Sequence, residues 1–554
     1  MKLTGADILI QVLKEEGVEV IFGYPGANTL PINDSLIDSS IRHYMMRHEQ
    51  AAAHAADGYA RVTGKVGVCL STSGPGATNM VTGIATAFMD STPMVALTAQ
   101  VNTDLLGRDA FQETDIIGIT MPITKHSFQV NHVRNLASNI RQALHLAQTG
   151  RPGPILVDLP KDVLAAPGDE SLLAETITKG PSKGLENPEQ LERIAQALNQ
   201  SERPVIIIGG GIKLGNACDE MSILVQQTGI PFVTTMMGID SVSATGDLNL
   251  GFIGTHGQEL ANRVIHQADF ILAVGMRFTE RTTPLIDDFA PMAKVAQIDI
   301  DPTSIGKNIK IDLPCVGDIR EALAGLMPQL DRKERSEWRQ RIERERAMQE
   351  QNLPQGGCGS AGRFISMMQD ALPADTTVVA DVGLNQIWTI RSWKCRTPRS
   401  LLSSGGMGTM GFSLPAAIGA QVGTPGRTVV SISGDGGFLM NIQELATINY
   451  YRLPLKVVVL NNGNLGMVRQ IQDLFYEKRF NTVDLGSGVD LVAVARGFGI
   501  PGSRINLEEN PEEGIERLRS SEGPYLLEVQ VDPDQYVYPI IAPGGNHLDM
   551  IYGK

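Results

Sequence analysis

Short apolar runs, bounded by glycine- or proline-rich turns, recur along the chain and alternate with stretches of helical periodicity. Such runs are typical of buried parallel strands, and their alternation with helices is typical of doubly wound sheets. The predicted strands are residues 18–22, 66–70, 94–97, 155–158, 204–208, 270–274, 295–299, 378–380, 429–432, 455–460 and 526–529. We therefore expect an α/β protein with doubly wound parallel sheets.

Two polar segments divide this pattern into three parts. Residues 166–190 are polar and contain several prolines and glycines, whereas residues 331–359 are charged and then glycine-rich, which predicts a solvated helix and a linker. We expect domains at residues 1–165, 190–330 and 360–554. The length of 554 residues agrees with three domains, at ~100–200 residues per domain.

The main candidate site follows the predicted strand at 429–432. The sequence SGDGGF comes directly after it, a helix is predicted at 441–451, and the next strand ends at the pair Asn461 and Asn462. This βαβ unit brings Asp435 and Asn462 to the carboxyl ends of two strands, where open α/β sheets bind ligands. A carboxylate and an amide oxygen suit Mg²⁺, which shares its other positions with phosphates. Asn464 is a third candidate ligand.

Glycines beside Asp435 point to a phosphate group as the second ligand. Gly434, Gly436 and Gly437 let backbone N–H groups approach a diphosphate, and the following helix turns its positive end toward the same charge. A lone Gly-Asp-Gly is usually a surface turn, but the Asn pair at βαβ spacing favours the binding site.

Charge and composition exclude several classes of partner. The net charge is -14, and no basic stretch is free of acidic residues, so neither nucleic acid nor anionic lipid is an expected partner. No apolar run approaches the ~18 residues of a membrane span. Residues 1–17 have an acid-containing amphipathic pattern that is unlike a signal or transit peptide. Five cysteines without zinc spacing favour a reducing compartment, so we expect a cytoplasmic protein.

The Asp435 motif with Asn462 resembles the thiamine diphosphate (ThDP) motif of the ThDP-dependent decarboxylase and carboligase superfamily. Within it, nearly the whole chain resembles acetohydroxyacid (acetolactate) synthase catalytic subunits. The matching stretches are GYPG at 23–26, RHE at 47–49, DAFQE at 109–113, TKH at 124–126, RPGP at 151–154, PKD at 160–162, GMVRQ at 466–470 and FY at 475–476.

The resemblance implies which residues carry the chemistry. Glu49 would activate ThDP by favouring the imino tautomer of its aminopyrimidine ring, although a first-turn acid can also simply complement a helix dipole. Phe111, Gln112 and Lys161 would approach the reacting centre. Gln112 can donate to a developing oxyanion, or it is only a polar loop residue. Arg277 is a candidate clamp on the carboxylate of the acceptor substrate.

The resemblance also implies two organic cofactors. Met410 would wedge between the two rings of ThDP, unless it is an adaptable core methionine. The other implied ThDP contacts are Pro25, Gly26, Gly76, Asn79, Gly408, Gly434, Gly436, Gly437 and Met467. A structural FAD would contact Gly210, Gly211, Thr255, His256, Gly275, Arg277, Asp299 and Asp318. One departure concerns this FAD site, because the family usually has RFDDR where residues 277–281 are RFTER.

The implied activity is decarboxylation of pyruvate and carboligation to a second 2-keto acid, which gives 2-acetolactate or 2-aceto-2-hydroxybutyrate in branched-chain amino acid biosynthesis. Glu49 and the diphosphate site lie in different domains, so the resemblance implies a homodimer or homotetramer with sites between chains. It leaves open a small regulatory subunit. The alternatives are another ThDP carboligase, a decarboxylase or a pyruvate oxidase, and, from another class, a silent nucleotide-binding subunit. Glyoxylate carboligases lack the glutamate that Glu49 represents.

A second departure concerns the acceptor pocket. After MVRQ the family commonly has a tryptophan, in a Gln-Trp-Gln sequence that shapes this pocket, whereas this chain has Ile471. Isoleucine offers less contact area to the extra methyl group of 2-ketobutyrate. We therefore expect weak discrimination between the two acceptors.

Overall fold

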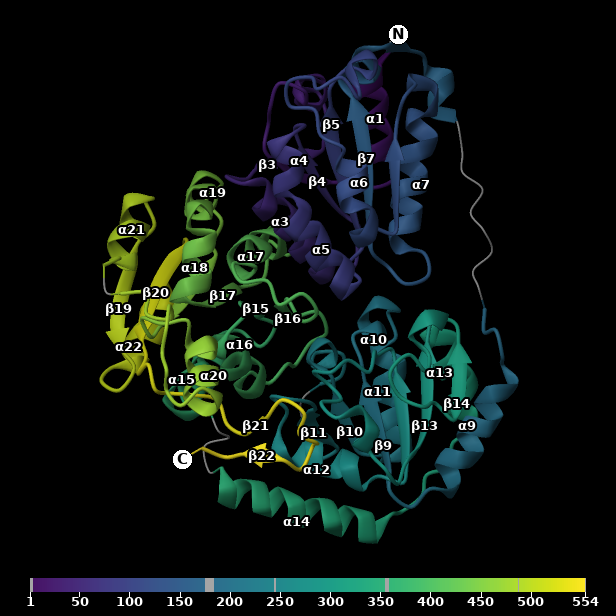
Figure 1. The fold of residues 1–554 in the computed structure, drawn as a ribbon, viewed down its shortest axis with the longest axis vertical. Helices are drawn as coiled ribbons and strands as arrows, with labels where there is room; N and C mark the ends of the chain where they lie inside the picture. The colour runs from purple at the N-terminus through teal and green to yellow at the C-terminus, as the bar shows by residue number, and fades with distance from the viewer. Residues whose placement is uncertain (1–2, 175–183, 244–245, 354–357, 487, 554) are drawn as a thin grey trace.

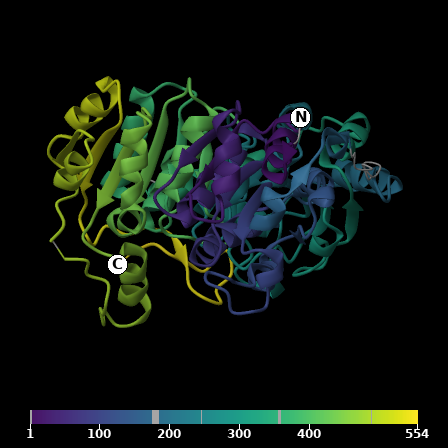
Figure 2. The ribbon, with the colours of Figure 1, turned by 90° about the horizontal axis from the view of Figure 1, so that it is seen from above.

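Three six-stranded parallel sheets, each flanked by helices, make up the fold of this computed structural model (Figures 1 and 2). The structure describes residues 3–174, 184–243, 246–353, 358–486 and 488–553. The strand orders are β3-β2-β4-β5-β7-β6, β11-β10-β9-β12-β13-β14 and β16-β15-β17-β18-β20-β19. The predicted α/β class with doubly wound parallel sheets is confirmed.

The N-terminal sheet lies between two layers of helices. Its strands are β2 (Val20–Gly23), β3 (Arg42–Met45), β4 (Gly67–Ser71), β5 (Met94–Gln100), β6 (His126–Gln129) and β7 (Pro154–Pro160). Its helices are α1 (Gly5–Glu15), α2 (Leu30–Ile37), α3 (Glu49–Thr63), α4 (Pro75–Asn79), α5 (Val81–Asp90), α6 (Ile116–Thr120), α7 (Leu136–Gln148) and α8 (Lys161–Ala165). Within the expected linker, a short strand β8 (Pro167–Gly168) pairs with β1 (Leu3–Thr4); residues 175–183 lie outside the described part.

The middle sheet is built in the same way. Its strands are β9 (Pro204–Ile208), β10 (Phe232–Thr234), β11 (Asn249–Phe252), β12 (Phe270–Val274), β13 (Lys294–Asp299) and β14 (Leu313–Val316). Its helices are α9 (Glu189–Gln200), α10 (Gly211–Leu214), α11 (Cys218–Thr228), α12 (Glu259–Gln267) and α13 (Ile319–Leu326). The predicted solvated helix is α14 (Ser336–Asn352), which runs along the surface and buries Trp338 and Ile342 (Figure 1).

The C-terminal sheet corrects one prediction. Its strands are β15 (Thr377–Ala380), β16 (Leu401–Ser403), β17 (Val429–Gly434), β18 (Lys456–Asn461), β19 (Gly502–Asn506) and β20 (Tyr525–Gln530). Its helices are α15 (Gly359–Ala371), α16 (Leu384–Ser392), α17 (Ser413–Gly423), α18 (Asp435–Met440), α19 (Leu445–Tyr450), α20 (Gly466–Phe475), α21 (Leu491–Gly497) and α22 (Pro511–Ser520). The helix predicted at 441–451 corresponds to η9 (Ile442–Glu444) and α19, but the prediction missed the separate helix α18 before it. Helical structure begins at Asp435, is interrupted at Asn441, and resumes through the short 3-10 turn η9.

Helix α3 joins the N-terminal and C-terminal domains by packing against α17. A Cβ atom on Gly58 would lie 2.0 Å from the carbonyl oxygen of Ala416, and one on Gly419 would lie 1.8 Å from that of Ala55. Only glycine permits so close an approach of two helix backbones. The two domains are therefore in close backbone contact along these helices.

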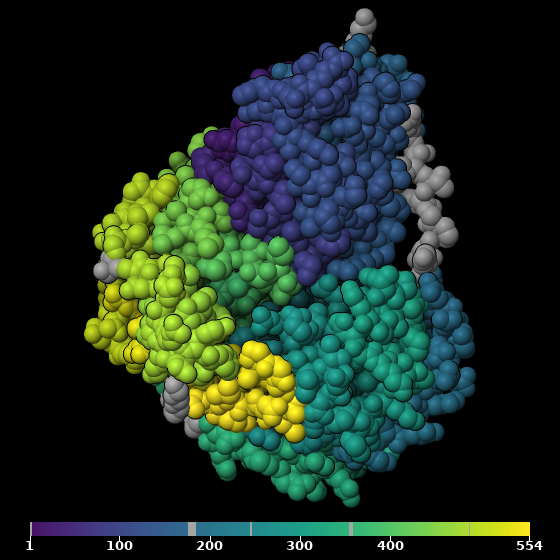
Figure 3. Space-filling view, in the orientation of Figure 1, coloured from purple at the N-terminus to yellow at the C-terminus, as the bar shows by residue number. Residues whose placement is uncertain are grey.

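The C-terminal segment crosses from its own domain onto the middle domain, as the yellow chain in Figures 1 and 3 shows. Its strands β21 (Ile540–Ile541) and β22 (Met550–Ile551) form an antiparallel pair. Tyr552 donates its hydroxyl to Glu259 across 2.8 Å, and a ring nitrogen of His547 lies 3.0 Å from the carbonyl oxygen of Thr282. In the described part of the chain, no helix is both long and apolar enough to cross a membrane.

Candidate active site

Asp435 and Asn462 lie at the carboxyl ends of the neighbouring strands β17 and β18, as the βαβ spacing predicts. These strands are paired in register up to Gly434 and Leu460, so both side chains follow at one edge of the sheet. Asp435 is 5% exposed, and burial raises the pKa of its carboxyl to about 6, although nearby backbone N–H groups lower it. A buried carboxylate at this position favours a cation beside it.

The donor set fits Mg²⁺. Asn464, two residues after Asn462, has a buried Oδ1 atom without a hydrogen-bond partner among the described residues. Its Nδ2 donates to the carbonyl oxygen of Asn462 across 2.9 Å. An unpaired buried oxygen needs a partner, and a hard cation supplies one. In the described ranges, no group of three or more His, Cys, Asp or Glu side chains is placed so that it could hold a metal ion. A metal at this edge would therefore be held by amide as well as carboxylate oxygens.

The loop that carries Met410 is fixed by a buried carboxylate that sequence reasoning missed. Asp381 follows β15 and accepts hydrogen bonds from the backbone N–H groups of Gly411 at 3.0 Å and Ser413 at 2.8 Å. The Cε atom of Met410 lies 3.5 Å from where a Cβ atom of Gly436 would stand. Met410 is thus held over the glycines at the start of α18.

One large cavity, of about 1650 Å³, runs from this edge into the middle domain. Residues of the C-terminal and middle domains form most of its wall, together with Met89, Asp90 and Arg151 of the N-terminal domain. The predicted site residues that line it are Gly210, Gly211, Thr255, His256, Gly275, Arg277, Asp299, Asp318, Gly408, Met410, Gly434, Asp435, Gly436, Gly437, Asn462, Asn464 and Met467.

The middle-domain end of the cavity fits a dinucleotide. The backbone N–H of Gly211 donates to the carbonyl oxygen of Gly275 across 2.9 Å, and a Cβ atom on Gly209 would lie only 2.0 Å from that oxygen. Glycines that approach so closely after a strand form a cradle for a pyrophosphate. His256 has a buried Nε2 atom without a partner among the described residues, and burial, with Arg391 and Arg281, lowers its pKa to about 3. A neutral imidazole with an unused nitrogen is available to a ligand.

The two predicted acids of the middle domain differ in their surroundings. Asp299, at the end of β13, is 8% exposed, and burial raises the pKa of its carboxyl to about 6. Asp318 caps α13, and its Oδ1 accepts from the backbone N–H groups of Arg320 and Glu321. Capping is therefore a structural role for Asp318 besides its place in the cavity wall.

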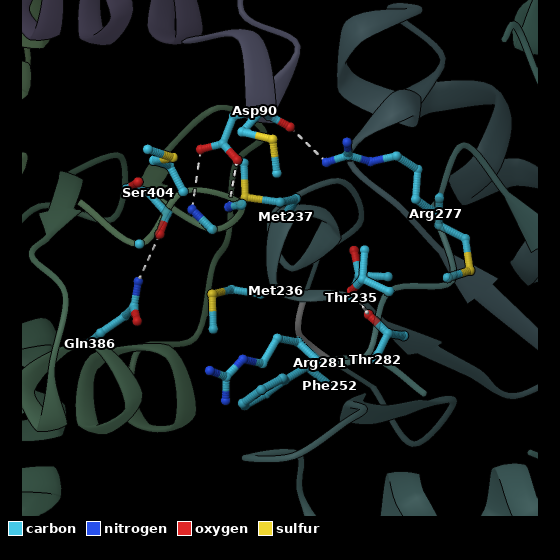
Figure 4. A pocket seen from close by; sticks show the side chains of 18 of the residues that line it. Asp90, Thr235, Met236, Met237, Phe252, Arg277, Arg281, Thr282, Gln386 and Ser404 are labelled. Carbon is cyan, nitrogen blue, oxygen red and sulfur yellow. Dashed lines mark hydrogen bonds between the residues drawn. The ribbon is translucent and has the colours of Figure 1, made fainter. Parts of the chain in front are cut away.

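Arg277 reaches from the middle domain to the N-terminal domain. Its Nη2 donates to the carbonyl oxygen of Met89 across 2.6 Å, beside Asp90 (Figure 4). Burial is the main cause that lowers its pKa below the ordinary value, and Arg151 adds to this. The guanidinium has further donors for a ligand, since an arginine carries five N–H groups.

A second group of predicted residues lies at the carboxyl edge of the N-terminal sheet. Glu49 begins α3 and is 8% exposed, and its Oε2 accepts from the Nδ2 of Asn79 across 3.0 Å. A Cβ atom on Gly76 would lie 3.2 Å from the Oε1 of Glu49, so the glycine keeps space open beside that oxygen. Pro25 and Gly26 follow β2 at the same edge, and Asn28 bonds Ser73 across 2.6 Å.

Phe111, Gln112 and Lys161 belong to this second group. Phe111 is 88% exposed, and Gln112 has a φ of 63°, in the left-handed region. Glu113 accepts hydrogen bonds from the backbone N–H groups of Gly107, Arg108 and Ala110, which curls the loop that presents them. Lys161 begins α8 after β7, and its neighbour Asp162 bonds Thr103.

Within one chain the two groups are separate. The predicted site residues of the N-terminal domain that belong to the second group do not line the large cavity; they are Pro25, Gly26, Glu49, Gly76, Asn79, Phe111, Gln112 and Lys161. Residues that sequence reasoning missed, among them Asp90, Met236 and Gln386, do line it (Figure 4). Only the tertiary arrangement brings them there.

Comparison with known proteins identifies the family. The N-terminal TPP binding domain of thiamine pyrophosphate enzymes matches residues 3–119, their central domain matches residues 191–326, and their C-terminal TPP binding domain matches residues 381–529. A probable acetolactate synthase large subunit of Methanocaldococcus jannaschii is 43% identical and covers 99% of this chain and 95% of its own length. The chain belongs to the acetolactate synthase large-subunit family.

Two bacterial relatives agree with this assignment. The acetolactate synthase isozyme 2 large subunit of Escherichia coli is 39% identical, over 99% of both chains. The acetolactate synthase large subunit of Corynebacterium glutamicum is 40% identical, over 100% of this chain and 90% of its own. The resemblance inferred from the motifs is therefore confirmed, and with it the thiamine diphosphate chemistry of the family.

Proposed function

We propose that this chain converts two molecules of pyruvate into one 2-acetolactate and one CO₂, in branched-chain amino acid biosynthesis. It also accepts 2-ketobutyrate in place of the second pyruvate, which gives 2-aceto-2-hydroxybutyrate. The observation that carries the proposal is the pair of site halves: Asp435 with Asn462 at one sheet edge, and Glu49 with Asn79 at another. Bound ThDP supplies the electron sink for the reaction. The chain supplies binding, orientation and proton transfer.

Mg²⁺ is the proposed metal, held by Asp435, Asn462 and Asn464. The unpartnered Oδ1 of Asn464 and the buried carboxyl of Asp435 support it. The backbone N–H groups at the start of α18 would meet the diphosphate, with the glycines at 434, 436 and 437 giving access. Pro25, Gly26, Gly76, Gly408, Met410 and Met467 are the other proposed ThDP contacts.

Glu49 is the proposed activating acid. Because its Oε2 is occupied by Asn79, its Oε1 is the oxygen that would exchange a proton with the pyrimidine end of ThDP. Gln112 would donate from its amide to the oxyanion that develops on the substrate carbonyl. Phe111 and Lys161 would line the same approach, and Arg277 would bind the acceptor carboxylate through its free N–H groups.

FAD is the proposed occupant of the middle-domain end of the cavity. The glycine cradle at Gly209 to Gly211 and the unpartnered nitrogen of His256 support a dinucleotide there. The net reaction transfers no electrons, so the flavin would be structural. A purified chain should be yellow, and its flavin should stay oxidised through turnover with pyruvate. A colourless preparation of full activity would exclude FAD.

We further propose a homodimer or homotetramer in which Glu49 of one chain meets the Asp435 site of its partner. The separation of the two site halves within one chain supports this. Heterodimers of a Glu49→Gln chain with an Asp435→Ala chain should recover activity, because one of their two sites has both residues intact. Failure to recover any activity would exclude the shared site.

The remaining proposals concern organisation. Residues 1–165 would bind the pyrimidine end of ThDP, residues 190–330 the FAD, and residues 360–554 the diphosphate and Mg²⁺. The relatives are named large subunits, so a small regulatory subunit is a proposed partner. The five free cysteines support a reducing compartment, and we propose the cytoplasm.

An assay with pyruvate, Mg²⁺ and ThDP tests the activity. We expect 2-acetolactate and CO₂ in equal amounts, with no product when ThDP or Mg²⁺ is omitted. A pyruvate oxidase would instead consume oxygen and bleach its flavin, and a decarboxylase would release acetaldehyde. A silent nucleotide-binding subunit would give no product at all.

A further inference from the structure

Helix α3 carries functional groups at both of its ends. Glu49 is its first residue, and Arg61 lies in its last turn, ~18 Å away at 1.5 Å per residue. Arg61 forms ion pairs with two carboxylates whose side chains are fully buried, Asp57 on the same helix and Asp90 at the end of α5. The Arg61–Asp90 pair, with a distance of 2.9 Å between Nη2 and Oδ2, has no role in the function proposed above.

Asp90 does more than balance the charge of Arg61. Its carboxylate accepts hydrogen bonds from the backbone N–H groups of Gly405, at 3.1 Å, and Gly406, at 2.7 Å (Figure 4). Arg61 donates its Nη1 to the carbonyl oxygen of Ser403, at 2.9 Å. The ion pair of the N-terminal domain therefore binds three consecutive peptide groups of the C-terminal domain in the same chain.

These peptide groups begin the loop that carries Met410. On its far side the loop is bound to Asp381 through Gly411 and Ser413, and Thr409 bonds Thr86 of α5 across 2.7 Å. A Cβ atom on Gly406 would lie 2.8 Å from the Oδ1 of Asp90, so the loop approaches the carboxylate too closely for any side chain at position 406. Hydrogen bonds to a charged, buried acceptor are strong and directional.

We propose that Asp90, held by Arg61, is a positioning residue that sets the Met410 loop of its own chain against bound ThDP. This inference rests on the shared site proposed above. It assigns two roles to one N-terminal domain: Glu49 serves the site that is completed by the partner's diphosphate domain, and Asp90 serves the site in its own chain. Helix α3 connects the two sites of a dimer.

The first test replaces the carboxylate with an isosteric amide. In Asp90→Asn, one backbone N–H faces an amide nitrogen, and the loop loses its charged acceptor. We expect the dissociation constant of ThDP, measured by equilibrium dialysis with Mg²⁺, to rise at least about tenfold, and kcat to fall about a hundredfold, the scale of a ~1 Å misplacement. The control is Asp38→Asn, which changes an exposed carboxyl of the same domain and should change neither quantity.

Heterodimers then show which site Asp90 serves. Paired with a Glu49→Gln chain, the Asp90→Asn chain should recover activity, because its Glu49 meets an intact diphosphate domain with an intact Asp90. Paired with an Asp435→Ala chain, it should recover none, because each site then has a defect. Asp90 lies in the same domain as Glu49. In these pairings, however, Asp90→Asn would show the recovery pattern expected of a defect in the diphosphate domain, as Asp435→Ala does.

Other outcomes overturn the proposal. The reverse pairing pattern would mean that Asp90 serves the partner's site, and no recovery with either chain would mean a purely structural role. If Asp90→Asn does not fold, Arg61→Lys, which keeps the charge but not the paired N–H groups, should give the same pattern. If the Glu49→Gln and Asp435→Ala chains fail to complement each other, the shared site is wrong. In that case an unchanged ThDP affinity in the Asp90→Asn homodimer would still overturn the positioning role.

Discussion

The carboxyl group of Glu444 accepts a hydrogen bond from the backbone N–H of Arg47 across 3.0 Å, and so joins the C-terminal domain to the backbone two residues before Glu49. Glu444 is fully buried in η9, and Thr447 donates to its Oε2 across 2.8 Å. Because Asp435 begins α18, directly before η9, one segment holds both the proposed metal ligand and the start of α3.

Replacing Glu444 should disturb Glu49 more than it disturbs ThDP binding. Glu444→Ala leaves the buried N–H of Arg47 without an acceptor, at a cost of about 1–3 kcal/mol in the free energy of unfolding. We expect kcat to fall while the ThDP dissociation constant changes little. Glu444→Gln keeps an acceptor oxygen and should restore most of kcat. Equal kcat in wild type and Glu444→Ala would show that Arg47 is held by other contacts.

The same carboxyl predicts a pH dependence of stability. Burial raises the pKa of Glu444 from 4.5 to about 7, against the lowering effects of Thr447 and Arg47. The folded chain therefore binds more protons than the unfolded chain between these values, and stability falls as pH rises through this window. The loss attributable to Glu444 is on the order of 3 kcal/mol.

Comparison with Glu444→Gln isolates this contribution, because other buried carboxyls titrate equally in both proteins. Thermal midpoints measured from about pH 5 to about pH 8 should fall more steeply in the wild type than in the variant. Parallel curves would mean that the carboxyl is already ionised at the lower pH.

Loss of Asp435 should abolish ThDP binding that depends on Mg²⁺. Asp435→Ala would remove the proposed charged ligand of Mg²⁺ and leave the diphosphate charge uncompensated. ThDP should pass through a desalting column with the wild type in Mg²⁺ but separate from the variant. Retention by the wild type in the presence of a chelator would contradict a metal-mediated site. Asp375→Ala, which changes a half-exposed carboxyl of the same domain, is the control.

Glu49→Gln should separate binding from chemistry. The amide can still bond Asn79 but cannot take a proton, so turnover should fall at least about a hundredfold, the scale of positioned acid–base groups. ThDP affinity should remain within a few-fold of wild type. Near-normal turnover would exclude Glu49 as the activating residue and leave it a first-turn helix acid.

The sequence predicts the fold where strands are buried on both faces. The central strands appear as continuous apolar runs, such as residues 204–208 and 270–274, which match β9 and β12. The missed strands include the edge strands β3, β6 and β19, which mix polar with apolar residues. They also include β10 and β16, which are buried but have only three residues each, too few for a recognisable apolar run. An edge strand lacks the apolar pattern that a central parallel strand requires.

The site residues likewise divide into those that local sequence spacing predicts and those that only the tertiary structure brings together. Asp435 and Asn462 follow predicted strands within one βαβ unit, so local spacing is enough to bring them together. Asp90 and Glu444 act on backbone groups 316 and 397 positions away, at Gly406 and Arg47. Their own segments have no local pattern for these contacts, which depend on how α3 packs against α17.

We predict that the acceptor preference depends on Ile471, which lines the cavity from α20 and is 38% exposed. The neighbouring residue Gln470 anchors α20 to Val537. Its side-chain amide donates to the carbonyl oxygen of Val537 across 2.8 Å and accepts from the backbone N–H of Val537 across 3.2 Å. The structure therefore turns Ile471 toward the cavity rather than only against a neighbouring helix. Its aliphatic side chain offers less contact to an extra methyl group than the flat tryptophan common in the family.

One methylene is worth only ~1–3 kcal/mol even in a well-fitted pocket, so a poorly matched wall should discriminate little. With equal pyruvate and 2-ketobutyrate, we expect 2-acetolactate to remain a major product. Ile471→Trp should raise the share of 2-aceto-2-hydroxybutyrate roughly tenfold, on the same pocket energetics. Ile471→Leu, which keeps size and apolar character, should leave the product ratio close to that of the wild type.

If the wild type already strongly favours 2-aceto-2-hydroxybutyrate, or if Ile471→Trp leaves the ratio unchanged, other residues of the cavity select the acceptor. The contact area at position 471 then has no part in that selection.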